Sequence, residues 1–256
     1  MSRKPLAISN WKMAMTITES LSFVHDFRAI ADDLLEAVDV VVCPPYTALW
    51  PVAQALQDGR LQLGAQNVAP SADKAHTGQI SAALLADAGC QWVILGHWEV
   101  RRHIGDDDAI VNHKVHLALK AGLRPILAVG EAQVASLPLE QTLDRQLAQV
   151  LAGCQAGQVA NMAFMYEPEG AIGVGAPSSP RHVAAACEFI RSWLHHRWGN
   201  VAAEGARVVY GGSVAPEYVA DLLAYPEIDG LAATRRGRVA ATFAKIVQLI
   251  AGRRGH

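Results

Sequence analysis

Three side chains of the sequence, those of Lys12, His97 and Glu167, are of the types that move protons next to a carbonyl group. A carboxylate can remove a proton from carbon, and an imidazole can polarise a carbonyl and pass protons between oxygens. An ammonium can stabilise the oxyanion that develops during the transfer. Taken singly, each would more often be an ordinary solvated or hydrogen-bonded residue. Brought to one site, they would form a proton-transfer set for a carbon acid.

The segment that follows Glu167 adds to this interpretation. Glu167 ends an apolar run, and Pro168 comes directly after it, followed by Gly170, Gly173 and Gly175. Such a segment is either an ordinary strand-to-helix turn or a movable cover beside a base. A reactive enediolate has to be kept from water, so a closing lid next to the base suits this chemistry.

Short apolar runs alternate along the chain with longer stretches of helical periodicity, such as 20–38 and 139–154. Continuously apolar strands are typical of a parallel sheet that is covered on both faces. Repeated β/α units in 256 residues favour a closed (β/α)8 TIM barrel, as a single domain over residues 1–256, above an open doubly wound sheet. A dinucleotide-binding sheet is disfavoured because no Gly-x-Gly-x-x-Gly follows the first strand. The candidate strands are 6–9, 38–43, 61–66, 92–96, 125–130, 162–167, 207–212 and 228–233.

In such a barrel the carboxyl ends of all strands meet at one mouth, where the functional residues gather. Lys12, His97 and Glu167 would then face a common centre, although they are far apart in the sequence. The residues expected at this mouth are Asn10, Lys12, Gln66, Asn67, His97, Glu131, Glu167, Gly211, Gly212, Ser213, Thr234 and Arg235.

The composition limits the partners and the location of the protein. A formal net charge of −2 and the lack of a concentrated basic block make nucleic acid a poor candidate partner. The beginning of the chain does not resemble a signal peptide, and no apolar run is long enough to cross a membrane. Four cysteines without metal-binding spacing are typical of free thiols in a reducing cytoplasm. We therefore expect a cytoplasmic protein that binds neither nucleic acid nor membranes.

Six motifs in order resemble the triosephosphate isomerase family from end to end. The resemblance implies interconversion of glyceraldehyde 3-phosphate and dihydroxyacetone phosphate through an enediol(ate), as in glycolysis and gluconeogenesis, with no metal or organic cofactor. The motifs are SNWKM (9–13), GAQNV (64–68), HTGQISAALLADAG (76–89), VILGHWEVRR (93–102), YEPEGAIGVG (166–175) and YGGSV (210–214).

The resemblance also implies roles for single residues. Glu167 would be the base, His97 a neutral electrophile held at a helix N-terminus, and Lys12 a second electrophile paired with Glu99. Thr77 would reach towards a partner's active site in a homodimer. The residues expected to bind the phosphorylated sugar are Asn10, Lys12, Gly173, Gly212, Ser213, Thr234 and Arg235.

The chain departs from the family pattern near the base. Glu169 and Gly170 stand where the family has Val-Trp, at the hinge of the lid. Trp98 replaces the serine that follows the histidine, and Val100 replaces an arginine. An indole next to Glu167 could desolvate the base, or it could fill the space that the base uses when the lid is open.

A further departure lies in the loop after the eighth strand, where the family has a Gly-Gly pair that binds phosphate through backbone N–H groups. Here Thr234 and Arg235 take those positions. The guanidinium of Arg235 or Arg236 could replace the lost contacts, lie in solvent or obstruct the site. Two alternative functions follow: isomerisation of another small phosphorylated ketose, such as a tetrulose phosphate, or anion binding by a catalytically weak homologue.

Overall fold

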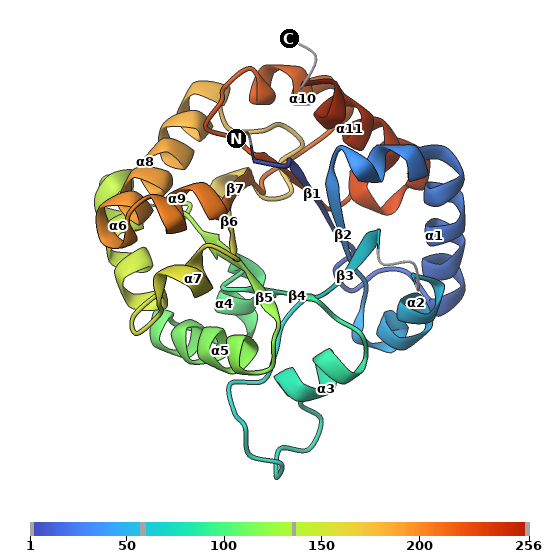
Figure 1. Ribbon diagram of the computed structural model, residues 1–256, viewed down its shortest axis with the longest axis horizontal. Helices are drawn as coiled ribbons and strands as arrows, with labels where there is room; N and C mark the ends of the chain where they lie inside the picture. Colours follow the sequence, from blue (N-terminus) through green and yellow to red (C-terminus); the bar gives the residue numbers. More distant parts are fainter. Residues whose placement is uncertain (1–2, 57–59, 135–136, 254–256) are drawn as a thin grey trace.

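The computed structural model describes residues 3–56, 60–134 and 137–253. Within them, eight parallel strands close into a barrel in sequence order, and the helices surround it (Figure 1). The closed (β/α)8 barrel predicted from the sequence is confirmed, and each strand lies within two residues of its predicted bounds. The strands are β1 (Leu6–Asn10), β2 (Asp39–Cys43), β3 (Leu61–Ala65), β4 (Trp92–Leu95), β5 (Arg124–Val129), β6 (Ala163–Tyr166), β7 (Arg207–Tyr210) and β8 (Gly230–Ala233).

The barrel closes where β8 pairs with β1, with Leu6 opposite Gly230. A Cβ added at Gly230 would lie 1.8 Å from the Leu6 carbonyl oxygen, so the closure needs glycine there. Apolar side chains fill the inside of the barrel, and a second core lies between the strands and the helices. The inner layer consists of Leu6, Ile8, Val41, Cys43, Trp92, Ile94, Ile126, Ala128, Ala163, Met165, Val209 and Ala232.

The α-helices cover the outside of the barrel in Figure 1, and short 3₁₀ helices lie between them. The α-helices are α1 (Ile17–Ala31), α2 (Leu49–Ala55), α3 (Ala82–Asp87), α4 (Trp98–Ile104), α5 (Asp108–Lys120), α6 (Leu139–Val150), α7 (Ala156–Val159), α8 (Pro180–Trp198), α9 (Asn200–Gly205), α10 (Pro216–Leu223) and α11 (Ala240–Gly252). The 3₁₀ helices are η1 (Asp32–Glu36), η2 (Tyr46–Ala48), η3 (Glu169–Ala171) and η4 (Arg236–Arg238).

The first helix differs from the continuous segment 20–38 that the periodicity predicts. It begins earlier, at Ile17, because Thr16 and Glu19 form a capping box: each side chain accepts the other's backbone N–H. It ends at Ala31, whose φ of −132° leaves the helical region, and η1 continues to Glu36. The segment 139–154 is likewise helical only to Val150.

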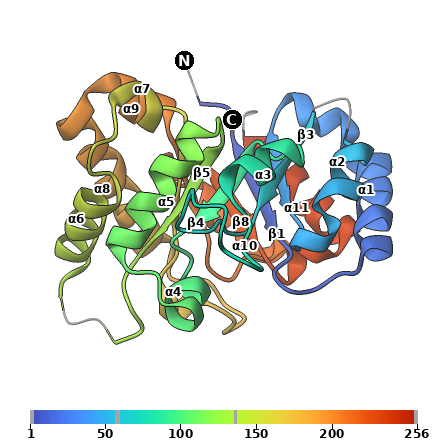
Figure 2. The same ribbon diagram turned by 90° about the horizontal axis from the view of Figure 1, so that it is seen from below.

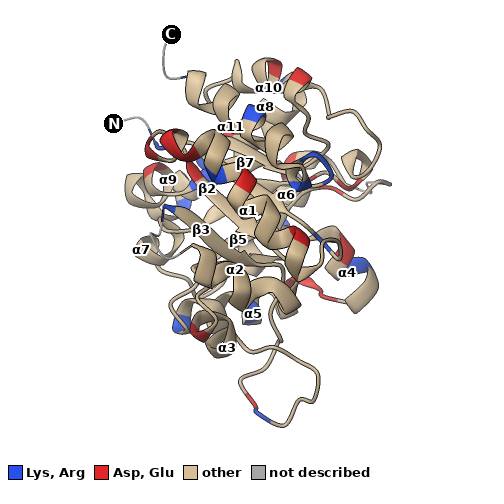
Figure 3. Cartoon of the chain, turned by 90° about the vertical axis from the view of Figure 1, so that its right-hand side faces the viewer, with Lys and Arg blue, Asp and Glu red and all other residues tan. Residues whose placement is uncertain are grey.

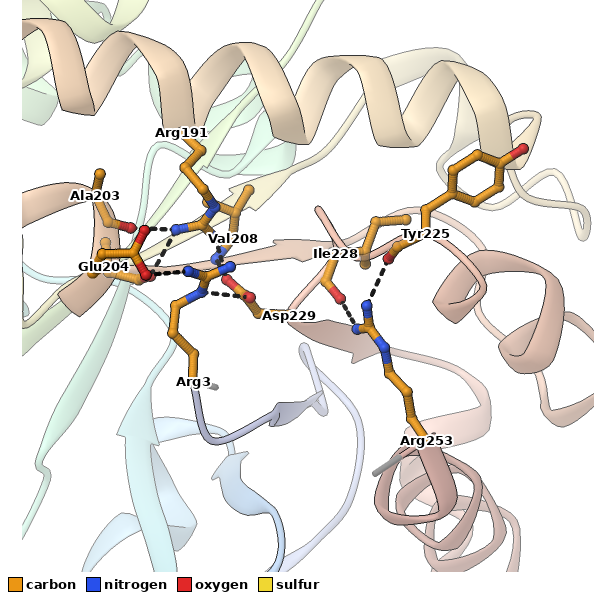
Figure 4. Close-up of polar contacts among 10 residues, drawn as sticks. Arg3, Arg191, Ala203, Glu204, Val208, Tyr225, Ile228, Asp229 and Arg253 are labelled. Carbon is orange, nitrogen blue, oxygen red and sulfur yellow. Dashed lines mark hydrogen bonds and ion pairs between the residues drawn. The ribbon is translucent and has the colours of Figure 1, made fainter. Parts of the chain in front are cut away.

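One edge of the barrel holds the loops that follow the carboxyl ends of the strands, with α4 beside them at the lower edge of Figure 2. At the opposite edge of the barrel, Asp229 directly precedes β8 and is 7% exposed. Its carboxylate accepts hydrogen bonds from Arg3, from Arg191 of α8 and from the backbone N–H of Val208 in β7 (Figure 4). This polar cluster therefore ties three elements together on the side away from the site.

Charged residues of both signs are scattered over the helices and loops (Figure 3). Among the described residues, no helix combines the length and the apolar character that spanning a bilayer requires. All four cysteines are buried free thiols. Burial raises the pKa of Cys90 to about 12 and that of Cys154 to about 11, so these thiols remain protonated at neutral pH.

Candidate active site

Lys12 follows β1 in a strained backbone conformation. Its φ is 51°, in the left-handed region that residues other than glycine rarely adopt. The Asn10 side chain accepts the Lys12 N–H at 3.0 Å, and the Gln66 amide donates to the Lys12 carbonyl at 2.9 Å. Strain of this kind persists where neighbours hold the residue for a function. Asn10, expected to bind substrate, contacts Lys12 in this structure.

The Lys12 ammonium pairs with Glu99 of α4, with 2.5 Å between Nζ and Oε1. The Lys12–Glu99 ion pair expected from the sequence is therefore confirmed. Burial raises the pKa of Glu99, but the hydrogen bond and charge of Lys12 lower it more, and the net shift is downward. Glu99 thus remains ionised at neutral pH, and the pair joins the end of β1 to α4.

His97 is the N-cap of α4, and 3% of its surface is exposed. Its Nδ1 accepts the backbone N–H of Glu99 at 3.1 Å, so in a neutral ring Nε2 carries the proton. Nε2 lies 3.1 Å from Oε1 of Glu167, although the two groups are poorly aligned for a hydrogen bond. The imidazole and the carboxylate are therefore close enough to act on neighbouring atoms of one ligand.

Two opposing influences act on the pKa of His97. Burial lowers the pKa of His97, but the charge and contact of Glu167 raise it more, so the pKa lies above its ordinary value. Neutralising Glu167 would remove this influence and return His97 towards the neutral form.

Glu167 directly follows β6 and is 2% exposed. Its backbone N–H donates to Val129 at 2.8 Å, which fixes it at the end of the sheet. Its carbonyl accepts the indole N–H of Trp98 at 2.8 Å. Gly130 has to be glycine for this arrangement, because an added Cβ would lie 2.4 Å from the Glu167 carbonyl oxygen.

The segment after Glu167 folds over the strand ends and is held by β7 and the loop after it. The Ser213 hydroxyl donates to the Ala171 carbonyl at 2.9 Å and accepts the Gly175 N–H at 3.3 Å. The Tyr210 hydroxyl accepts the Ser178 N–H at 2.9 Å. Hydrogen bonds to Ser213 and Tyr210 therefore hold the glycine-rich segment across the mouth of the barrel. This position suits the lid that the sequence indicates.

A cavity of about 110 Å³ lies beneath this lid. It brings together most of the residues predicted for the site. Asn10 and His97 do not line it, but Asn10 contacts Lys12 and His97 lies beside Glu167. Thr77 lies elsewhere, exposed on the loop between β3 and α3. The predicted residues that line the cavity are Lys12, Glu167, Gly173, Gly212, Ser213, Thr234 and Arg235, and Arg236 lies beside them.

Several polar contacts near the strand ends were not predicted from the sequence. The Tyr166 hydroxyl donates to Glu131 at 2.9 Å and contacts His182 at 2.8 Å. Lys114, 1% exposed, pairs with buried Asp106. Tyr166 stood within a quoted motif and Glu131 at a strand end, but the distant partners of neither residue leave a signal in one sequence.

Nearly the whole chain is similar to known triosephosphate isomerases, the family that the sequence motifs resemble. Residues 5–250 match the family model described as triosephosphate isomerase. The triosephosphate isomerase of Carboxydothermus hydrogenoformans is 41% identical over 89% of this chain and 91% of its own length. That of Chloroflexus aurantiacus is 40% identical over 96% and 98%, respectively.

A solved structure agrees with these sequence matches. The crystal structure of triosephosphate isomerase from Bartonella henselae has a TM-score of 0.84 to this chain at 33% sequence identity, and it covers 96% of this chain and 99% of its own. The resemblance seen in the motifs is therefore confirmed. The chain belongs to the triosephosphate isomerase family.

Proposed function

We propose that Glu167, His97 and Lys12 carry out the reaction of the family in this protein. Triosephosphate isomerase activity itself follows from family membership and from relatives about 40% identical over nearly their full length. The reaction interconverts glyceraldehyde 3-phosphate and dihydroxyacetone phosphate. One observation supports the residue roles above all: the Glu167 carboxylate lies 3.1 Å from His97 Nε2 beside a cavity that Lys12 also lines.

This geometry supports the following sequence of proton transfers. Glu167 removes a proton from the substrate carbon next to the carbonyl and returns it to the neighbouring carbon. His97 donates its Nε2 proton to one substrate oxygen and takes a proton from the other. Once Glu167 holds the substrate proton, its charge no longer raises the pKa of His97. The Lys12 ammonium stabilises the negative charge on oxygen.

The lid provides the exclusion of water that the enediolate needs. Ser213 and Tyr210 hold its two halves, and the cavity beneath it is small. A closed, dry site strengthens the interactions of Lys12 and His97 with developing charge. The Gly173 amide, with Gly212 and Ser213, would bind the phosphate from the lid side. Thr234 and Arg235 would bind it from the loop after β8.

An assay of the purified protein tests this assignment and the alternative substrate together. Glyceraldehyde 3-phosphate should be isomerised, and Glu167→Ala should lower kcat by about 10²–10⁴-fold, the usual contribution of general acid–base catalysis. An erythrulose phosphate should react much more slowly. Wild-type kcat in Glu167→Ala would remove Glu167 from the mechanism. Turnover of neither substrate would favour the anion-binding homologue.

A homodimer completes the proposal. The residues 72–79 are exposed, and Met13, next to Lys12, is 99% exposed. Apolar surface so close to a catalytic lysine would be covered by a second copy, whose Thr77 would approach the site. Two-fold symmetry is the usual arrangement of such pairs. The cytoplasmic location stays a prediction, and the buried free thiols fit it.

A further inference from the structure

One face of α4 contacts the start of the lid. Trp98 and Arg102 are one helical turn apart, so their side chains project from the same face. The Trp98 indole N–H donates to the Glu167 carbonyl at 2.8 Å. The Arg102 guanidinium pairs with the Glu169 carboxylate, which also accepts the Gln133 N–H at 2.8 Å. Two successive turns of one face of α4 thus hold the residues on either side of Pro168.

The Trp98 contact acts on the backbone of the base rather than on its carboxylate. The Glu167 carbonyl belongs to the peptide unit that leads into Pro168, so holding it restricts the rotation that aims the side chain. The backbone N–H of Trp98 also lies 3.5 Å from Oε2 of Glu167. Because Glu167 is 2% exposed, losing the indole donor would leave its carbonyl with poor access to water.

The hinge of the lid has no side chain at Gly170 to pack against its surroundings. An added Cβ at Gly170 would meet only Gln133 Cγ, at 3.9 Å, so there is open space beside the hinge. A cavity of about 210 Å³ lies between α4 and the lid, lined by Trp98, Arg102, Gly170 and Val174 among others. Glycine also loses the most conformational freedom when it is ordered. A hinge with this composition needs support from outside the lid, and α4 is the element in place to give it.

We propose that Trp98 is a positioning residue for Glu167. The ion pair between Arg102 and Glu169 holds the same hinge at a second place. We call these two contacts between α4 and the start of the lid, Trp98 with Glu167 and Arg102 with Glu169, the hinge clasp. Trp98 fixes the direction of the base, and Arg102 fixes the first residue of η3. This inference rests on the proposed role of Glu167 as the base.

Trp98→Phe tests the clasp because it keeps an aromatic ring and removes the N–H donor. We expect kcat for glyceraldehyde 3-phosphate to fall about tenfold, since small displacements of a catalytic group are costly, while KM changes less than twofold. Trp193→Phe is the matched control. Trp193 donates its indole N–H to Asp144 at 2.7 Å on the outer surface, and its loss should leave kcat unchanged.

A double-mutant cycle separates positioning from a general structural effect. Glu167→Asp withdraws the carboxylate, so adding Trp98→Phe to it should lower kcat less than twofold. All rates are measured well below the melting temperature of each variant. Arg102→Gln combined with Trp98→Phe should also lose less than the product of the single effects, because both grip one hinge.

The outcomes distinguish this inference from the assignment of the base. If Glu167→Ala is impaired as expected but Trp98→Phe keeps wild-type kcat, the clasp is overturned and the base stands. A full tenfold loss from Trp98→Phe in the Glu167→Asp background would also overturn it, since the effect would not pass through the base. Wild-type activity in Glu167→Ala would instead remove the base that the clasp is proposed to position.

Discussion

Arg235 stands where the family pattern has a phosphate-binding glycine, and it lines the cavity with Lys12, Gly173 and Ser213. A Gly-Gly pair would offer two N–H donors to a charged acceptor, each worth about 1.5–3 kcal/mol. The side chains now present at this loop restrict close approach of its backbone. A guanidinium reaches further than an amide and matches phosphate oxygens in pairs. We therefore propose that the Arg235 guanidinium supplies the phosphate with the donors that the glycine amides would otherwise provide.

Removing that guanidinium should weaken substrate binding specifically. Arg235→Ala is expected to raise KM for glyceraldehyde 3-phosphate by at least about tenfold, a loss of about 1.4 kcal/mol. Arg238→Ala serves as the control, because Arg238 is not among the residues lining the cavity, and its KM should stay within twofold. An unchanged KM in Arg235→Ala, with a raised KM in Arg236→Ala, would transfer the role to Arg236.

The position of a functional residue could be predicted where a short motif determines it. It could not be predicted where it depends on contact with a residue far away in the sequence. Lys12, His97 and Glu167 each follow a strand, so the barrel rule alone brings them to one mouth. The contact of Trp98 with the Glu167 carbonyl could not be read from the sequence, because it depends on the rotamer of an indole 69 positions away. The upward shift in the pKa of His97 depends on the same kind of long-range contact, with Glu167.

At the scale of elements, glycines between β7 and α10 serve packing as well as the proposed phosphate contact. A Cβ at Gly212 would lie 2.0 Å from the Tyr210 hydroxyl, the group that holds the lid at Ser178. A Cβ at Gly211 would lie 2.4 Å from Met165 Cγ in the barrel interior. These positions allow β7, the lid and the core to approach one another, which is a structural reason for the Gly-Gly pair in YGGSV.

The Asp229 cluster at the opposite edge should matter for stability rather than for turnover. Asp229→Asn leaves the Arg3 and Arg191 guanidinium groups facing a neutral side chain in a largely buried setting (Figure 4). Breaking a buried pair on one side typically costs 3–5 kcal/mol, and the partial exposure of both arginines argues for roughly 3. The free energy of unfolding in urea, at one protein concentration, measures the loss.

Glu204→Gln is the matched control for this measurement. Glu204 pairs with Arg3 at 2.8 Å, but its side chain is 60% exposed, and exposed pairs contribute at most about 1 kcal/mol. Neither variant should change kcat. Equal stability of Asp229→Asn and the wild type would mean that the carboxylate makes no net contribution to holding β7, β8 and α8 together.

The elements themselves were largely predictable, because continuous apolar runs and helical periodicity are both local patterns. Their ends were less so. The break between α1 and η1 arises at Ala31, within a stretch whose apolar spacing continues, and only the backbone conformation reveals it. The latch between the lid and β7 joins residues that are 32 to 42 positions apart, and their sequence spacing gives no indication of it.

At the scale of the whole molecule, the loop between β3 and α3 extends well beyond the barrel (Figures 1 and 3). Its base is closed by a hydrogen bond from the Ala69 N–H to the Ile80 carbonyl at 2.9 Å. Residues 72–79 beyond this bond are exposed. Ordering a loop that is so exposed costs conformational entropy, which contacts with its own barrel do not offset. Insertion into a second copy of the chain would offset that cost.

Thr77→Arg tests whether this loop builds the dimer and supports the site. An added cation at an interdigitating tip would have to be buried without a partner, so the variant should sediment as a monomer at micromolar concentration. Its kcat should fall by at least about tenfold, because an unsupported Lys12 loop misplaces a catalytic group. Thr142→Arg, on the outer helix α6, is the control and should remain a fully active dimer. A wild-type chain that sediments as a fully active monomer would refute the dimer. A fully active Thr77→Arg monomer would show instead that each barrel completes its own site.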